Sequence, residues 1–278
     1  MVNIITDSTA DLSQELISNF KLSIIPLLVT IGGKDYRDGV DLGQKELFDL
    51  VKKHGELPKT AAPSAGEFAK AFDRPGESIF IGISSQLSAT IQNAKLAADM
   101  LPAGQVTVVD SLNLSTGVGL LALRAAEYRD EGLLADEIVA RLTESRLKVH
   151  TSFVIDTMEY LYKGGRCTAI QAIAGSVLKI HPIIEVRSDG SLGVKSKARG
   201  TLQKGHQQML DDFAARLPEL DRRRVFVTHT FEFDESVQFL VEGVKRVASP
   251  EEVCVTRAGS VISSHCGPGT AGILYFVK

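Results

Sequence analysis

The first half of the chain alternates between short strand-like runs and segments with helical spacing. Runs rich in β-branched and apolar residues occupy Val2–Ile5, Ser78–Ile83 and Val106–Asp110. Apolar residues recur at helical spacing in Thr90–Leu101 and Thr116–Glu131. Strands that alternate with helices in this way predict βαβ units around a mostly parallel sheet. We therefore expect this half to form an α/β domain of Rossmann-like type with flanking helices.

The second half of the chain follows another pattern. The dipeptide Asp189-Gly190 separates two alternating segments, which predicts a β-hairpin. A helix is predicted over Thr201–Arg216, and strand-like runs follow it. Hairpins mixed with helices indicate an α+β domain with a mixed or antiparallel sheet. We place the boundary so that residues 1–150 form the first domain and residues 151–278 the second.

Composition and charge narrow the class of protein. Hydrophobic residues make up 44% of the 278 residues, enough for a substantial core. The net charge of -3 argues against a nucleic-acid partner, because such proteins usually carry a basic excess. No run reaches the roughly eighteen uninterrupted apolar residues of a membrane span, and the first residues do not resemble a secretory signal. The three cysteines form no C-x-x-C pair, so we expect reduced thiols, a cytoplasmic location and no integral membrane segment.

Two hydroxyl-rich segments are the first candidates for a binding site. The segment Ile83–Thr90 holds Ser84, Ser85 and Ser88 where a predicted parallel strand meets the next helix. Ligands of α/β sheets bind at this edge, and a helix start with nearby hydroxyls suits an anion. Simple helix capping by the serines is an equally good explanation. Thr60 lies in a predicted turn before another helix, which would start at Ser64, so we expect both segments to face one rim of the sheet.

A late histidine and a glycine-flanked arginine are the other candidates. His265 precedes a Gly-Pro-Gly sequence, and such a histidine could donate to a carboxylate or phosphate and titrate near neutrality. A histidine in a turn with a purely structural hydrogen bond explains it equally well. Arg166 follows two glycines, and its guanidinium suits bidentate recognition of an anion, although a solvated loop charge is the simpler explanation. The six histidines lack metal-ligand spacing, and neither a phosphate loop nor a G-x-S-x-G motif is present, so we predict no metal and no catalytic residue.

Six segments, taken in order, give the chain a family resemblance. The chain resembles the DegV family, the FakB-type fatty-acid-binding proteins that act as acyl carriers for bacterial fatty acid kinase. The resemblance covers essentially the whole chain, and its specificity comes from the order of the segments. They are residues 5–12, 60–68, 83–90, 161–166, 182–186 and 265–269.

The resemblance implies a function and a set of contacts. A long-chain fatty acid, such as palmitate, would occupy a buried tunnel as the ligand, with no other cofactor. The head-group contacts of the family carry over to Thr60, to Ser84 or Ser85, and to His265, and Arg166 matches an arginine near the head group. A separate fatty acid kinase subunit would phosphorylate the bound carboxylate, so the chain would be a carrier and not an enzyme. Further candidates for the rim or tunnel are Ser88, Gly267 and Ser8.

Two other functions fit the same residues. One is a sensor or interaction protein in which a bound lipid only regulates a partner. The other is a serine hydrolase of lipid esters, with Ser85, His265 and Asp7 as a triad, although nothing in the local sequence specifies that arrangement.

Overall fold

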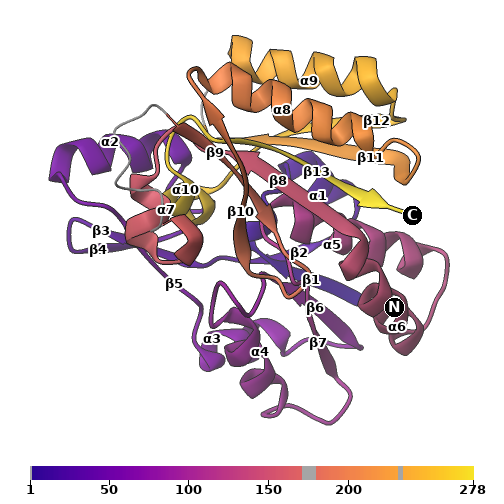
Figure 1. The fold of residues 1–278 in the computed structure, drawn as a ribbon. Coiled ribbons are helices and arrows are strands. Elements are labelled where there is room, and N and C mark those ends of the chain that lie inside the picture. The colour runs from indigo at the N-terminus through magenta and orange to yellow at the C-terminus, as the bar shows by residue number, and fades with distance from the viewer. Residues whose placement is uncertain (1, 171–179, 231–233) are drawn as a thin grey trace.

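The computed structural model describes residues 2–170, 180–230 and 234–278. The strands of these residues form three sheets, of four, six and three strands. Helices cover the sheets and separate them from one another (Figure 1). No helix in the described residues is both long enough and apolar enough to cross a lipid bilayer.

The four-stranded sheet is parallel throughout and has the order β2-β1-β6-β7. All five residues of the inner strand β6 are buried, as expected for a parallel strand covered on both faces. The predicted α/β fold of the first half is therefore confirmed. The strands are β1 (Asn3–Asp7), β2 (Ser23–Ile25), β6 (Ser78–Gly82) and β7 (Val106–Asp110).

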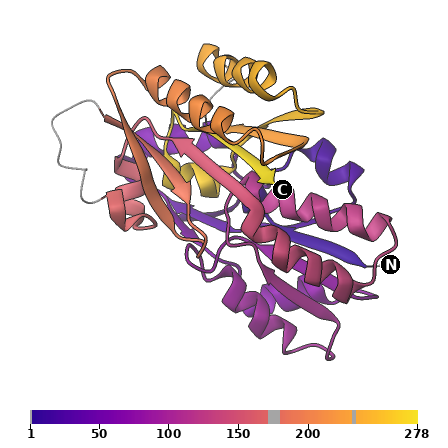
Figure 2. The ribbon, with the colours of Figure 1, turned by 45° about the vertical axis from the view of Figure 1, so that its right-hand side comes forward.

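Helices pack on both faces of this sheet. A cluster of Phe68, Phe72 and Phe80 joins α3 to β6, with ring centroids 5.1–5.6 Å apart. Ser64 caps α3 by accepting the Glu67 N–H, so the prediction of a helix starting there is confirmed. Figure 2 shows α5 and α6 side by side near the N-terminus. The helices are α1 (Gln14–Asn19), α3 (Ala65–Phe72), α4 (Thr90–Ala98), α5 (Thr116–Asp130) and α6 (Ala135–Ser145).

The six-stranded sheet is mixed and has the order β10-β9-β8-β13-β11-β12. Only the β11–β12 pair is parallel, so the predicted mixed sheet of the second half is confirmed. Helices α8 and α9 cover one face (Figure 1). The elements are β8 (Val149–Val154), β9 (Ile180–Val186), β10 (Leu192–Arg199), α8 (Leu202–Ala215), β11 (Leu220–His229), α9 (Glu235–Ala248), β12 (Glu252–Arg257) and β13 (Ala271–Val277).

Helix α5 connects the two larger sheets. It contacts β1 and β6 on one side and β8 and β13 on the other. Its residues are apolar on most faces because sheets lie on both sides of it. One apolar cluster consequently runs from Ile4 to Phe276 without a break at residue 150. The division into residues 1–150 and 151–278 stays a prediction.

The three-stranded sheet has the order β4-β3-β5 and carries one of the candidate residues. Gly32 and Gly33 have φ angles of 59° and 72° and form the tight turn of the β3–β4 hairpin. The expected turn at Thr60 is wrong, because Thr60 lies in β5 and pairs with Val29. Helices α2, α7 and α10 lie close by (Figure 1). The elements are β3 (Leu28–Ile31), β4 (Lys34–Arg37), α2 (Gln44–His54), β5 (Lys59–Ala61), α7 (Glu159–Gly164) and α10 (Ser260–Cys266).

The described residues also form short 3-10 helices, which are η1 (Ser8–Ala10), η2 (Arg146–Lys148) and η3 (Thr168–Ile170).

Candidate functional site

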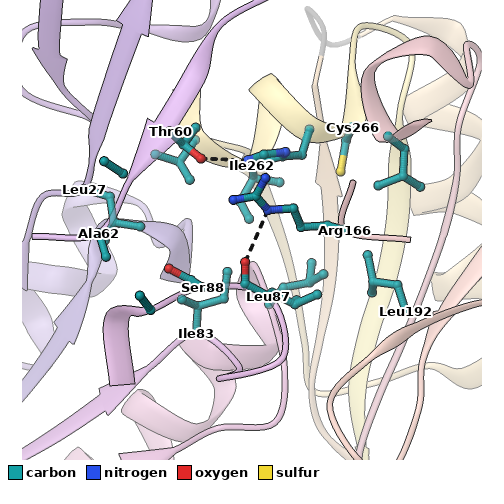
Figure 3. A pocket seen from close by; sticks show the side chains of 16 residues that line it. Leu27, Thr60, Ala62, Ile83, Leu87, Ser88, Arg166, Leu192, Ile262 and Cys266 are labelled. Carbon is teal, nitrogen blue, oxygen red and sulfur yellow. Dashed lines mark hydrogen bonds between the residues drawn. The ribbon is translucent and has the colours of Figure 1, made fainter. Parts of the chain in front are cut away.

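A cavity of 260 Å³ lies between β5, the turn after β6, α7 and α10. Figure 3 shows that side chains from both halves of the chain project into it. Most of these side chains are aliphatic, and among the polar ones Thr60 and Arg166 lie near each other, while Ser88 lies apart beside Leu87. Such a cavity suits a ligand with an oily body and one polar end. The aliphatic lining includes Leu27, Ile83, Leu87, Leu114, Leu161, Leu192, Val261 and Ile262.

Thr60 and His265 form the polar contact at one wall of the cavity. The Thr60 Oγ1 atom lies 2.8 Å from Nε2 of His265, within hydrogen-bond distance (Figure 3). Thr60 comes from β5 and His265 from the last turn of α10, so the contact joins residues separated by 205 positions. The sequence predicted both residues for the site but expected both in turns. The structure places them on a strand and a helix.

The imidazole of His265 is held neutral at physiological pH. Burial and, to a smaller extent, the nearby Arg166 guanidinium together lower its pKa to about 4. Its Nδ1 atom is buried and has no hydrogen-bond partner among the described residues. Gly164 packs against it so closely that an added Cβ would lie 2.6 Å from Nδ1. The expectation that His265 titrates near neutrality is therefore wrong, because burial outweighs any benefit of charging the ring.

Arg166 lies at the open edge of the same cavity. Its Nη1 donates to the Gly164 carbonyl at 2.6 Å, and its Nε donates to the Leu87 carbonyl at 3.4 Å (Figure 3). The side chain is exposed. None of the ion pairs between described residues involves Arg166. Its charge is thus fixed in place by carbonyl groups and stays available to an anion.

The serines after β6 divide into one that lines the cavity and two that do not. Ser88 lines it and shares a 2.8 Å hydrogen bond with Thr90. Ser84 is buried and donates to the Gly190 carbonyl at 2.9 Å, beneath the β9–β10 hairpin. Ser85 is exposed, and its N–H donates to Asp110. Of these three serines, the structure therefore places Ser88, which was expected only at the rim, at the cavity, and it places Ser84 and Ser85 outside it.

The catalytic triad of the hydrolase alternative is not formed. Ser85 does not line the cavity that holds His265. Asp7 accepts hydrogen bonds from Thr9 and from the Ile83 N–H at 2.9 Å, and it lines a different cavity. The local geometry gives none of these residues a nucleophile–base contact.

Gly267 and Ser8, the other expected rim residues, have structural contacts outside the cavity. Gly267 ends α10 with φ 75°, and its carbonyl accepts from the Thr230 hydroxyl at 2.7 Å. Ser8 Oγ accepts the Leu27 N–H at 3.1 Å. Neither residue lines the cavity.

Two buried acids that the sequence did not reveal hold the helix on which His265 lies. Asp11 accepts the Gly259 N–H at 2.8 Å, and Asp38 accepts the Ser260 N–H at 2.7 Å. These N–H groups belong to the first turn of α10, where carboxylates are stabilising. Burial raises the pKa of both acids. Asp11 and Gly259 are 248 positions apart, so inspection of the sequence does not reveal the hydrogen bond between them.

Comparison with known proteins identifies the family. A family model described as "Uncharacterised protein, DegV family" matches residues 1–278. The chain belongs to the DegV family. A DegV domain-containing protein of Caldanaerobacter subterraneus is 33% identical over 284 residues, which cover 100% of this chain and 99% of the relative.

DegV-family structures share the whole fold. A fatty-acid-binding DegV family protein from Thermus thermophilus is 33% identical, with a TM-score of 0.91, and the match covers 100% of this chain and 99% of the other. DegV of Bacillus subtilis, described as a fatty acid binding protein, is 29% identical, with a TM-score of 0.85 and the same coverage. In the part of this DegV-family chain that the structure describes, no three acidic, histidine or cysteine side chains form a metal-binding group.

Proposed function

We propose that this DegV-family protein binds a long-chain fatty acid, with the tail in the aliphatic cavity and the carboxylate beside Thr60, Ser88 and His265. The observation that carries the proposal is the cavity itself, which is oily over most of its wall and has hydrogen-bonding groups near the Thr60–His265 contact. The fatty-acid-binding relative from Thermus thermophilus supports it, because that protein shares the fold over its full length.

The tail supplies most of the binding energy in this proposal. Each buried methylene contributes about 0.8 kcal/mol, so a chain of about fourteen contributes roughly 11 kcal/mol in gross transfer energy. Association costs of about 4–15 kcal/mol offset much of it. The polar end therefore selects and orients the ligand, because an unpaired buried carboxylate would be strongly unfavourable.

The tautomer of His265 determines whether the Thr60 hydroxyl can donate a hydrogen bond to the carboxylate of the ligand. When Nε2–H donates to Thr60 Oγ1, the Thr60 hydroxyl is free to donate to the ligand. The unpartnered Nδ1 atom is then a bare acceptor, which costs less to bury than an unused N–H. Thr60 and Ser88 thus offer neutral donors and leave the carboxylate unprotonated.

The same arrangement suits presentation of the acid to a kinase. The bound carboxylate oxygen would attack the γ-phosphorus of ATP held by a fatty acid kinase subunit, with ADP leaving and an acyl phosphate forming. Arg166 is exposed beside the cavity and would stabilise the added negative charge. The chain is then a carrier that supplies no catalytic residue to its own ligand. The proposal includes the cytoplasmic location that the sequence predicts.

Ligand loading tests the binding step directly. The purified protein is denatured, and its lipid extract is measured by mass spectrometry against the protein concentration. We expect about one long-chain fatty acid per chain, and at least tenfold weaker uptake by Thr60→Val and Ser88→Ala, since a hydrogen bond to a charged group contributes about 1.5–3 kcal/mol. Ser85→Ala is the matched control and should bind normally. An extract without aliphatic acid, and no uptake of added fatty acid, would exclude the function.

Acyl phosphate formation tests the carrier step separately. The loaded protein is mixed with a fatty acid kinase subunit and ATP, and acyl phosphate is trapped with hydroxylamine. We expect Arg166→Gln to bind fatty acid within about threefold of the unsubstituted protein but to slow transfer at least tenfold, because it acts on charge that develops during transfer. Binding without any product would favour the sensor alternative.

A further inference from the structure

A second cavity, of 210 Å³, is lined by cationic side chains and shares no lining residue with the fatty-acid cavity. It lies between the β7–α5 loop, η2, the end of β9 and the end of α8. No aspartate or glutamate is among the described residues that line it. The basic residues of this cationic cavity are Arg146, Lys148, His150, Arg187 and Arg216.

Several of these groups have hydrogen-bonding capacity to spare. Arg146 is anchored by one bond, from Nη1 to the Asp110 carbonyl at 3.0 Å, while its Nε is buried without a partner among the described residues. His150 stacks on Tyr275 with ring centroids 5.0 Å apart, and its buried Nδ1 likewise has no partner in that part of the chain. Buried donors and acceptors are normally satisfied, so these groups beside the cavity are available to hydrogen-bond a ligand.

The positive charge of the cationic cavity is only partly compensated, because the Asp189 carboxylate, which accepts hydrogen bonds from Ser191, also attracts Arg187. Of its arginines and lysine, only Arg216 has an ion pair among the described residues, a surface contact of 3.4 Å with Glu219. The carboxylate of Asp110 is occupied by backbone N–H groups. Burial and, to a smaller extent, the charges of Arg216 and Lys195 together lower the pKa of His150 to about 3, as expected in a positive field.

We propose that the cationic cavity binds a phosphate-bearing anion, either inorganic phosphate or a small phosphate monoester. A phosphate group carries about −1.5 to −2 charges at neutral pH and accepts hydrogen bonds at three or more oxygens, so it can use donors that arrive from four separate elements. The volume of 210 Å³ is enough for a phosphate group and a few attached carbon atoms. The site is independent of the fatty-acid function.

Titration with phosphate tests the assignment. Binding of sodium phosphate and of glycerol 3-phosphate is measured by calorimetry and by the shift in Tm, against sodium chloride of equal ionic strength. We expect both to bind and to raise Tm beyond the chloride control. The double variant Lys148→Gln with Arg187→Gln should bind at least tenfold more weakly.

Two controls keep the outcome specific. Lys197 is an exposed residue of β10 and lies outside the cavity. Its variant Lys197→Gln loses one positive charge and should bind phosphate like the unsubstituted protein. Fatty-acid loading, measured by mass spectrometry, should be equal in all variants, which separates this site from the proposed function. Equal responses to phosphate and chloride in the unsubstituted protein would overturn the proposal without any variant. Equal losses in Lys197→Gln and in the double variant would also overturn it.

Discussion

The small size of Gly164 allows it to pack against His265 at the cavity proposed for the fatty acid. A Cβ there would lie 2.6 Å from His265 Nδ1, so Gly164→Ala must displace the ring and weaken its contact with Thr60. We expect fatty-acid affinity to fall about tenfold or more, because a charge-assisted hydrogen bond contributes about 1.5–3 kcal/mol. Gly66→Ala is the control, since a Cβ at that position of α3 has open space around it. Equal affinities of both variants, measured by fluorescent fatty-acid displacement, would show that the ring position is unimportant.

Residue chemistry alone could select Thr60, Arg166 and His265 as candidates, and the structure brings all three to one cavity. Residue chemistry could not choose among Ser84, Ser85 and Ser88. That choice depends on the path of the turn after β6, in which the β9–β10 hairpin covers Ser84 and solvent surrounds Ser85. Contacts between segments more than 100 positions apart decide which hydroxyl faces the ligand.

At the scale of elements, α10 depends on acceptors that come from elsewhere in the chain. Asp38→Ala would leave the buried Ser260 N–H unpaired, at a cost of about 1–3 kcal/mol in the free energy of unfolding. Because His265 is on the same helix, fatty-acid affinity should fall as well. Asp38→Asn keeps an acceptor and should restore most of both losses, while Asp49→Ala on the exposed face of α2 should change neither. Urea unfolding and ligand titration of the four proteins measure the effects, and an Asn variant as weak as the Ala variant would argue against capping.

Dependence on contacts with distant residues also explains which helices and strands the sequence could predict and which it could not. Helix α8 has apolar periodicity, and its predicted bounds, Thr201–Arg216, agree with the observed Leu202–Ala215 to one residue at each end. Residues 260–266 combine serines, a histidine and a following Gly-Pro-Gly, so their local sequence favours a turn. They form a helix because distant carboxylates satisfy its first N–H groups. Strand β5 has only three residues and exists because β3 pairs with it.

At the scale of the whole molecule, buried histidines and buried acids make stability depend on pH in opposite directions. Burial lowers the pKa of His206 from its usual 6.5 to about 4, so the unfolded chain takes up the proton first and acid destabilises the fold between those values. Burial raises the pKa of Asp7 from 3.8 to about 6, so the folded chain takes up that proton first and acid stabilises the fold over that range. Over the range from pH 6 to pH 4 the contributions of these two groups therefore oppose each other.

Single substitutions should separate these two effects. Relative to the unsubstituted protein, His206→Gln should gain about 3 kcal/mol in the free energy of unfolding as the pH falls from 7 to 4, because its histidine no longer titrates. Asp7→Asn should lose a similar amount over the same range. Any constant packing cost of either substitution cancels, since only the change with pH is compared. Urea unfolding at four pH values measures both slopes, and parallel curves for all three proteins would mean that neither group titrates differently in the folded and unfolded states.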